Sequence, residues 1–178
     1  MSNNKYEIIY ADPPWRYDFS ETDTRKIENH YSTMSLQEIK NLSPPSEDNC
    51  ILFLWATAPK IIEAIDVIQA WGFEYKTQLI WDKEIIGMGY WFRGQHEILM
   101  VATKGNVSPP DQSKRISSVF RERRKKHSKK PDTIRVLINN WYPDKTKIEL
   151  FARDTFDGWD IHGNQAGSKK QMYLDNIS

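Results

Sequence analysis

Apolar residues fall into short continuous blocks that alternate with stretches of helical spacing along the chain. Blocks rich in β-branched and aromatic residues predict buried strands. Five of them occur, at residues 6–11, 49–55, 73–81, 97–103 and 147–152. Helical spacing follows Thr57 and Pro131, and the capping box Ser35–Glu38 predicts a further short helix. The chain therefore alternates between strands and amphipathic helices.

This alternation predicts an α/β fold in which a mainly parallel sheet is covered by helices on both faces. In such sheets, ligands bind beyond the carboxyl ends of the strands. Two strand ends carry polar groups, namely Asp12 after the first strand and residues 149–153 at the last. If these two strands are neighbours, one crevice serves both.

Composition supports a single domain over residues 1–178. The chain is 39% hydrophobic and 28% charged, which is typical of a globular protein. Its one cysteine, Cys50, excludes an internal disulfide, and no apolar run approaches the ~20 residues of a membrane span. No signal peptide is visible, so a cytoplasmic protein without membrane contact is expected. The polar tail after residue 171 is expected to be frayed.

The net charge of +1 hides a strongly basic segment inside a loop expected at about 106–130. Nine Lys and Arg residues and one acid, Glu122, lie between Lys114 and Lys130. Such a segment is either a solvated surface loop or a contact for nucleic acid phosphates. The candidate phosphate contacts are Arg121, Arg123, Arg124, Lys125 and Lys126.

The string Asp12-Pro13-Pro14-Trp15 carries the most specific chemistry. Its prolines fix φ and remove two backbone donors, which frees the Pro13 carbonyl to point into a pocket beside the Asp12 carboxylate. Two acceptors and the flat face of Trp15 suit a planar ring with an exocyclic amine, such as adenine. The alternative is a rigid turn with Trp15 in the core. Its position at the predicted mouth of a parallel sheet favours the pocket.

Metal chemistry is not expected. The four histidines are scattered through the sequence without ligand spacing, and a single cysteine does not support the usual zinc sites.

The sequence resembles the Asp-Pro-Pro-Trp family of S-adenosylmethionine-dependent N6-adenine methyltransferases, which includes the catalytic subunit of the messenger-RNA N6-adenosine methyltransferase. The resemblance covers nearly the whole chain and is closest to bacterial and phage members. Besides Asp12–Trp15, the matching segments are His30–Ser35, Leu52–Trp55, Trp71–Gly72, Gly94–Glu97 with Lys104–Asn106, Lys130–Asp132, Lys147–Arg153 and Gly163–Gln165.

The resemblance implies a circularly permuted Rossmann-like methyltransferase, with the catalytic motif before the cofactor motif. Asp12, Pro13, Pro14 and Trp15 would be catalytic, and Tyr31 would help to stack the target base. The implied contacts with S-adenosylmethionine come from Asp12, Lys130, Glu149, Phe151, Arg153, Asn164 and Gln165. Thr155 departs from the pattern, because close relatives have a histidine there.

The implied function is methyl transfer to adenine N6 in nucleic acid, with DNA preferred over RNA. RNA methylation and a catalytically silent nucleic-acid-binding subunit are the alternatives. A homodimer and a heterodimer are both left open by the sequence.

Overall fold

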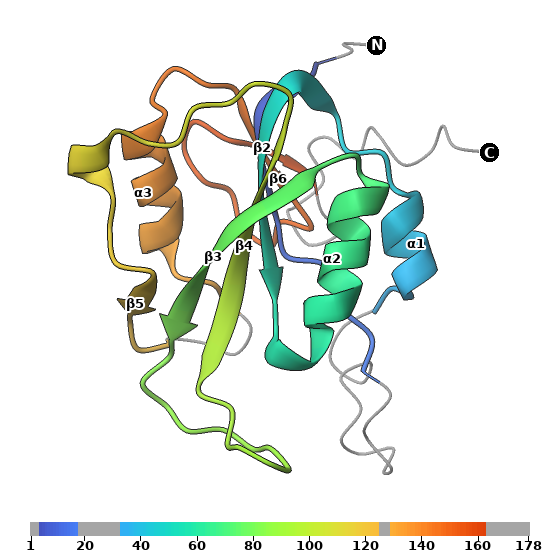
Figure 1. Ribbon diagram of the computed structural model, residues 1–178, viewed down its shortest axis with the longest axis vertical. Coiled ribbons are helices and arrows are strands. Elements are labelled where there is room, and N and C mark those ends of the chain that lie inside the picture. Colours follow the sequence, from blue (N-terminus) through green and yellow to red (C-terminus); the bar gives the residue numbers. More distant parts are fainter. Residues whose placement is uncertain (1–3, 18–32, 125–128, 163–178) are drawn as a thin grey trace.

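A computed structural model describes residues 4–17, 33–124 and 129–162. The described residues build a seven-stranded sheet in the order β5-β3-β4-β2-β1-β6-β7 (Figure 1). The strands are β1 (Tyr6–Ala11), β2 (Ser46–Ala56), β3 (Glu74–Asp82), β4 (His96–Lys104), β5 (Val119–Arg121), β6 (Lys147–Leu150) and β7 (Asp160–His162). The α-helices are α1 (Leu36–Asn41), α2 (Ile61–Ala70) and α3 (Asp132–Trp141), and short 3₁₀ turns cover Ala58–Lys60 and Gln112–Lys114.

All the strands described here run in one direction except β4, which is antiparallel to both of its neighbours. The sheet is therefore mainly parallel and Rossmann-like, as the sequence predicts. β1 lies between β2 and β6, so the strand before Asp12 and the strand that carries Glu149 are direct neighbours. This confirms that the two polar strand ends can share one crevice.

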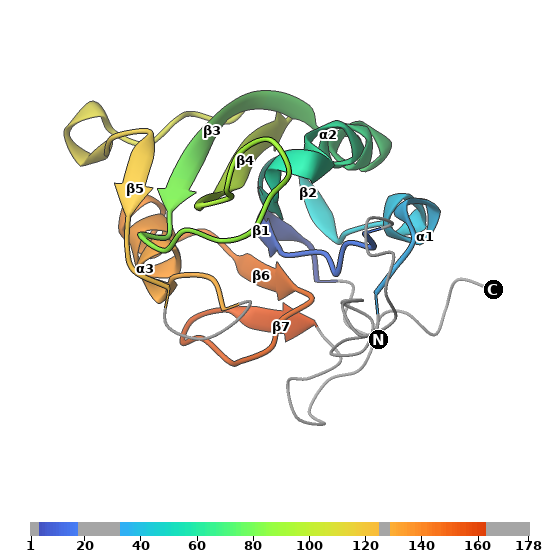
Figure 2. The ribbon, with the colours of Figure 1, turned by 90° about the horizontal axis from the view of Figure 1, so that it is seen from below.

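Side chains of β2 point alternately to the two faces of the sheet, and this divides the core into two layers. Cys50, Leu52 and Leu54 pack beneath α1 and α2, whereas Ile51, Phe53 and Trp55 pack on the side of α3. Figure 2 shows α1 and α2 on one face of the sheet and α3 on the other. The Cys50 side chain is fully buried, and this burial raises the pKa of its thiol to about 12.

The helix boundaries follow local chemistry. The predicted capping box forms at α1, where Ser35 and Glu38 satisfy each other's backbone N–H groups. Gly72 follows the C-cap Trp71 of α2 and adopts a φ of 78°, which suits a residue without a side chain. Pro131 caps α3 instead of occupying its first turn, so that helix begins one residue later than predicted.

The loop expected at 106–130 is more ordered than the sequence suggests. Its residues 119–121 form β5, which pairs in parallel with the end of β3 at the sheet edge. Both β5 and β7 were missed because three residues are too few to show a strand pattern. The tail after 171 lies outside the described residues.

Candidate active site

A cavity of about 360 Å³ opens at the edge where the parallel strands end. Asp12 directly follows β1, Thr57 directly follows β2, and Arg153 lies just beyond β6. Glu97 reaches the same edge because β4 runs in the opposite direction and begins there. The residues lining the cavity are Asp12, Pro13, Pro14, Trp15, Tyr17, Thr33, Trp55, Ala56, Thr57, Pro59, Glu97, Arg124, Lys130 and Arg153.

Lys130 connects two carboxylates in this cavity. Its Nζ lies 2.8 Å from Asp12 Oδ2 and 3.1 Å from Glu97 Oε2. Lys83 adds a second cation, 3.4 Å from the other oxygen of Glu97. Lys130 Nζ also lies 5.6 Å from the centre of the Trp55 ring, within the range of a cation–π contact. Two acids and two bases thus form one cluster that is largely shielded from water.

The pKa values of this cluster follow from its burial and pairing. Burial raises the pKa of Asp12, although the nearby Lys130 opposes the rise. Burial alone would also raise the pKa of Glu97, but the charges of Lys130 and Lys83 outweigh this effect, so the pKa of Glu97 is lowered. Burial would lower the pKa of Lys130, yet Asp12 and Glu97 together raise it. Lys130 therefore stays charged, and the pKa values of the two carboxylates shift in opposite directions.

The Asp-Pro-Pro-Trp turn differs in one respect from the sequence-based prediction. The Pro13 carbonyl is not free of local bonding, because it accepts a hydrogen bond from the Trp15 backbone N–H at 2.8 Å. The Pro14 carbonyl also accepts a hydrogen bond, from the Met34 N–H at 2.9 Å. In this tight turn the Pro13 carbonyl and the Trp15 N–H are separated by only two positions in the chain, so they bond to each other. A carbonyl oxygen has two lone pairs, and one of those on Pro13 remains for a ligand.

Trp15 both packs in the core and lines the cavity. Only 7% of it is exposed, and its Nε1–H donates to the Trp55 carbonyl at 3.1 Å. In turn, Trp55 donates its own Nε1–H to the Tyr10 hydroxyl at 2.6 Å. The core interpretation and the pocket interpretation of Trp15 therefore both hold. These bonds fix the indole and leave part of its surface toward the cavity.

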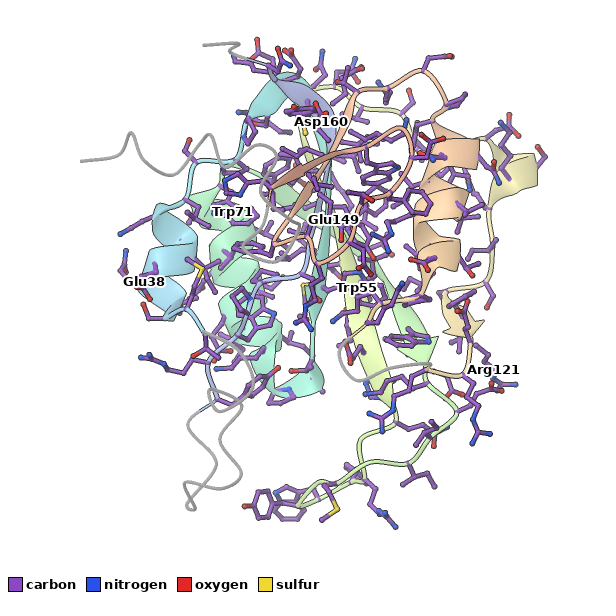
Figure 3. All side chains as sticks on the ribbon, turned by 180° about the vertical axis from the view of Figure 1, so that it is seen from behind. Glu38, Trp55, Trp71, Arg121, Glu149 and Asp160 are labelled. Carbon is purple, nitrogen blue, oxygen red and sulfur yellow. The ribbon has the colours of Figure 1, made fainter. Side chains whose placement is uncertain are left out.

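The predicted cofactor residues do not all lie at the cavity. Lys130 and Arg153 line the cavity, and Phe151 adopts a φ of 61° in the turn that leads to Arg153. Glu149 points toward α3 instead, where its Oε2 accepts a hydrogen bond from Arg135 at 2.6 Å. Asn164 and Gln165 lie outside the described residues. Figure 3 shows Glu149 and Trp55 on the same side of the sheet.

The basic residues approach the cavity from the β5 side. Arg124 lines the cavity, whereas Arg121 and Arg123 are exposed. Glu122 anchors this strand, because its carbonyl accepts the Trp81 indole N–H and its carboxylate accepts the Thr133 hydroxyl. The predicted contacts Tyr31, Lys125 and Lys126 lie outside the described residues.

Seven of the lining residues were not predicted as site residues from the sequence, and three of these add aromatic rings and a carboxylate to the cavity: Tyr17, Trp55 and Glu97. Tyr17 shares a 2.6 Å hydrogen bond with Thr57, and Lys60 lies over its ring. Glu97 begins a predicted strand in which it is the one charged residue. An acid in an apolar strand suggests a functional role, but Glu97 reaches the carboxyl edge of the sheet only because β4 runs antiparallel to its neighbours.

Neither a metal site nor a membrane span is found in the part of the chain that the structure describes. There, no three His, Cys, Asp or Glu side chains gather as metal ligands would. None of the described helices has the length and apolar character needed to span a bilayer.

A mainly parallel sheet with a polar cavity at its carboxyl edge defines a Rossmann-like enzyme fold. The acids, the lysine and the aromatic rings around this cavity suit a group-transfer reaction on a polar, planar substrate. The family model described as MT-A70 matches residues 6–165. The chain therefore belongs to the MT-A70 family and is a methyltransferase.

Individual relatives agree with this assignment. The chain is 35% identical to the type II methyltransferase M.MunI from Mycoplasma sp., and the match covers 96% of this chain and 82% of that protein. It is 32% identical to the N(6)-adenosine-methyltransferase MT-A70-like protein of Drosophila melanogaster and 31% identical to the human catalytic subunit METTL3. These matches cover 90% of this chain but only 27% and 28% of the two relatives.

Proposed function

We propose that this protein transfers a methyl group from S-adenosylmethionine to the N6 amine of adenine in DNA. The observation that carries the proposal is the Asp12–Lys130–Glu97 cluster, largely shielded from water, at the carboxyl edge of the sheet. The relative of which this chain spans 82% is a type II methyltransferase, a class that modifies DNA, and this supports DNA as the substrate. The N(6)-adenosine-methyltransferase relatives make RNA the second candidate.

The chemistry of the cavity fits the cofactor. Asp12 and Glu97 can accept hydrogen bonds from its ammonium group, and Lys130 and Arg153 can pair with its carboxylate. When bound, S-adenosylmethionine supplies a methyl group on a positively charged sulfur. The protein's task is then to hold the accepting amine in line with that methyl group.

Asp12 is suited to act on the accepting amine. The lone pair of this amine is delocalised into the adenine ring, which makes it a poor nucleophile. Hydrogen bonds from the N–H groups to the Asp12 carboxylate and the Pro13 carbonyl stabilise the positive charge that develops on nitrogen. Because burial raises the pKa of Asp12, this carboxylate is also suited to accept the proton that the methylated amine loses.

Lys130 keeps Asp12 ionised before the substrate arrives. Their 2.8 Å contact compensates the buried carboxylate, and Glu97 holds the same ammonium from its other side. When the target amine approaches Asp12, Lys130 can remain paired with Glu97. Trp15 and Tyr17 line the cavity beside these charges and offer ring surface to the base.

The function is tested by offering radiolabelled S-adenosylmethionine with unmethylated DNA and RNA of matched sequence. We expect label in N6-methyladenine, with DNA modified faster than RNA. Faster labelling of RNA would reverse the substrate assignment. Binding of both nucleic acids without label in either would identify a silent binding subunit.

Cofactor binding should raise the melting temperature. At about 100 times Kd, a ligand of the native state adds about 2.7 kcal/mol of stability, or roughly 5–10 °C for a chain of this size. The double variant Asn164→Ala/Gln165→Ala should lose this shift. Its matched control is Gln37→Ala/Asn41→Ala, which removes an amide pair on the surface of α1. If the variant Asn164→Ala/Gln165→Ala keeps the full rise in melting temperature, the cofactor does not bind at residues 164–165.

Neutralising the three arginines at residues 121–124, where β5 ends, should weaken DNA binding at all sequences. The variant Arg121→Gln/Arg123→Gln/Arg124→Gln should flatten the dependence of log K on log salt by about 0.9 for each phosphate that the protein no longer neutralises. Base preference should persist, because phosphate contacts do not read bases. Binding is measured by salt titration against the control Lys40→Gln/Lys76→Gln/Lys145→Gln. Equal affinities and equal slopes for both variants would make residues 121–124 an ordinary surface segment.

A further inference from the structure

The connection between β3 and β4 ends in a group of large apolar side chains that face solvent. Met88, Tyr90, Trp91 and Phe92 are 87–93% exposed. The chain has seven tryptophans, and the other six are buried or half-buried. A contiguous apolar group of this kind on a protein surface marks an interaction site. We call residues 88–92 the aromatic tip.

The aromatic tip is held on a closed backbone loop. Gly87 N–H donates to the Gly94 carbonyl at 2.8 Å, and Gly94 N–H donates to the Met88 carbonyl at 3.1 Å. The fold is tight enough to require glycine, since a Cβ on Gly89 would lie 2.0 Å from the Phe92 oxygen. Arg93 adds a bond from its Nε to the Gly87 carbonyl at 3.0 Å. The backbone that carries the rings is thus preformed.

The aromatic tip projects from the edge of the sheet that carries the active site. β3 ends at Asp82 and β4 begins at His96, so the connection leaves and re-enters the same edge as Glu97 (Figure 1). At its base, Lys83 N–H donates to the Gln95 carbonyl, and Gln95 donates to Asp82. Glu97, two residues beyond this base, contacts Lys130 in the cavity.

Cations accompany the aromatic tip. Arg93 belongs to the loop itself, and Arg121 lies beside its base, 3.5 Å from Asp82 (Figure 3). Arg124 is attached to the same base through its N–H, which donates to the Lys83 carbonyl. Apolar rings with flanking arginines complement stacked bases with flanking phosphates. In a symmetric tip-to-tip contact, a second copy of this chain would instead bring the same positive charges together.

We propose that the aromatic tip is a wedge that enters the base stack of duplex DNA next to the target adenine. This inference rests on the proposed function, because an adenine inside a duplex must leave the stack before it can reach Asp12. Apolar side chains that insert between base steps unstack them, and aromatic rings can then replace the stacking that the bases give up. The arginines at the base of the loop hold the flanking phosphates while the cavity receives the extruded base.

The test compares one DNA in two forms. Plasmid DNA without adenine methylation is offered as a duplex and after heat denaturation, with radiolabelled S-adenosylmethionine. We expect the variant Tyr90→Ala/Trp91→Ala/Phe92→Ala to lose about tenfold or more of the duplex rate but less than about threefold of the single-strand rate. Trp91→Phe, which keeps an apolar ring, should retain the duplex rate. Tyr75→Ala is the matched control, because Tyr75 is an exposed aromatic near the opposite end of β3.

The outcomes separate this inference from the proposed function. If the wild-type protein methylates neither form, the proposed function fails and the wedge fails with it. If the wild type is active and the triple variant loses both rates equally, or neither, the wedge alone is overturned. Light scattering adds another criterion: a lower mass for the triple variant than for the wild type would make the aromatic tip a contact between copies and overturn the wedge.

Discussion

Asp12→Ala should lower the rate of methyl transfer by about 10²–10³-fold, the cost of removing one preorganised polar group from a site of charge development. The fold should survive, because Asp12 follows β1 and contributes no apolar volume to the core. Lys130 keeps its second partner, Glu97, and so remains compensated. Activity is measured under saturating cofactor and DNA, and folding is checked by thermal melting.

Glu7→Ala is the matched control for Asp12→Ala. Glu7 lies on the same strand, far from the carboxyl edge, and pairs with Lys145 at 2.6 Å. This change should leave the methylation rate near that of the wild type. A folded Asp12→Ala protein with near-normal turnover would refute the role given to Asp12.

Arg135→Met should destabilise the protein by about 3–5 kcal/mol, because it leaves a buried carboxylate without its cation. Arg135 and Glu149 are both buried, and Arg135 also pairs with Asp132. Urea unfolding measures the loss. Lys145→Met removes a partly exposed ion pair and should cost no more than about 1 kcal/mol. Adding Glu149→Gln to Arg135→Met should restore much of the stability.

The cost of Arg135→Met should also depend on pH. Burial raises the pKa of Glu149, and Arg135 opposes this rise. Without Arg135, the pKa in the folded state rises further above its unfolded value. Protonated Glu149 then contributes its full stability at pH values below the pKa that it has in the unfolded chain. This contribution is lost as the pH rises through its pKa in the folded state. The deficit against the wild type should therefore be smaller near about pH 5 than near about pH 8, and a deficit that grows on acidification would contradict this account.

Much of the fold could be predicted from the sequence because its strands are continuous apolar blocks. The runs at 6–11 and 147–152 identified β1 and β6, and the polar residues after them located the crevice. The pairing of Lys130 with Asp12 could not be derived from pattern, since 118 positions separate the two residues. The direction of β4 decides whether Glu97 reaches the site, and strand polarity is set by tertiary packing.

The partner of Glu149 was missed for a related reason. The sequence resemblance assigned Glu149 to the cofactor, but nothing in a strand pattern says which helix side chain lies opposite. α3 packs over that face of the sheet and supplies Arg135. The aromatic residues at 88–92 show neither helical nor strand periodicity, so only the folded loop reveals that they face water.

The burial of Cys50 has a practical consequence for labelling experiments. Thiol-reactive reagents attack the thiolate, and a fully buried thiol with a pKa of about 12 offers neither access nor charge at neutral pH. A cysteine introduced at an exposed position can therefore carry a fluorophore or spin label without first replacing Cys50. The native thiol becomes reactive only when the layer that covers this face of β2 opens, so its labelling rate reports how often α1 and α2 separate from the sheet.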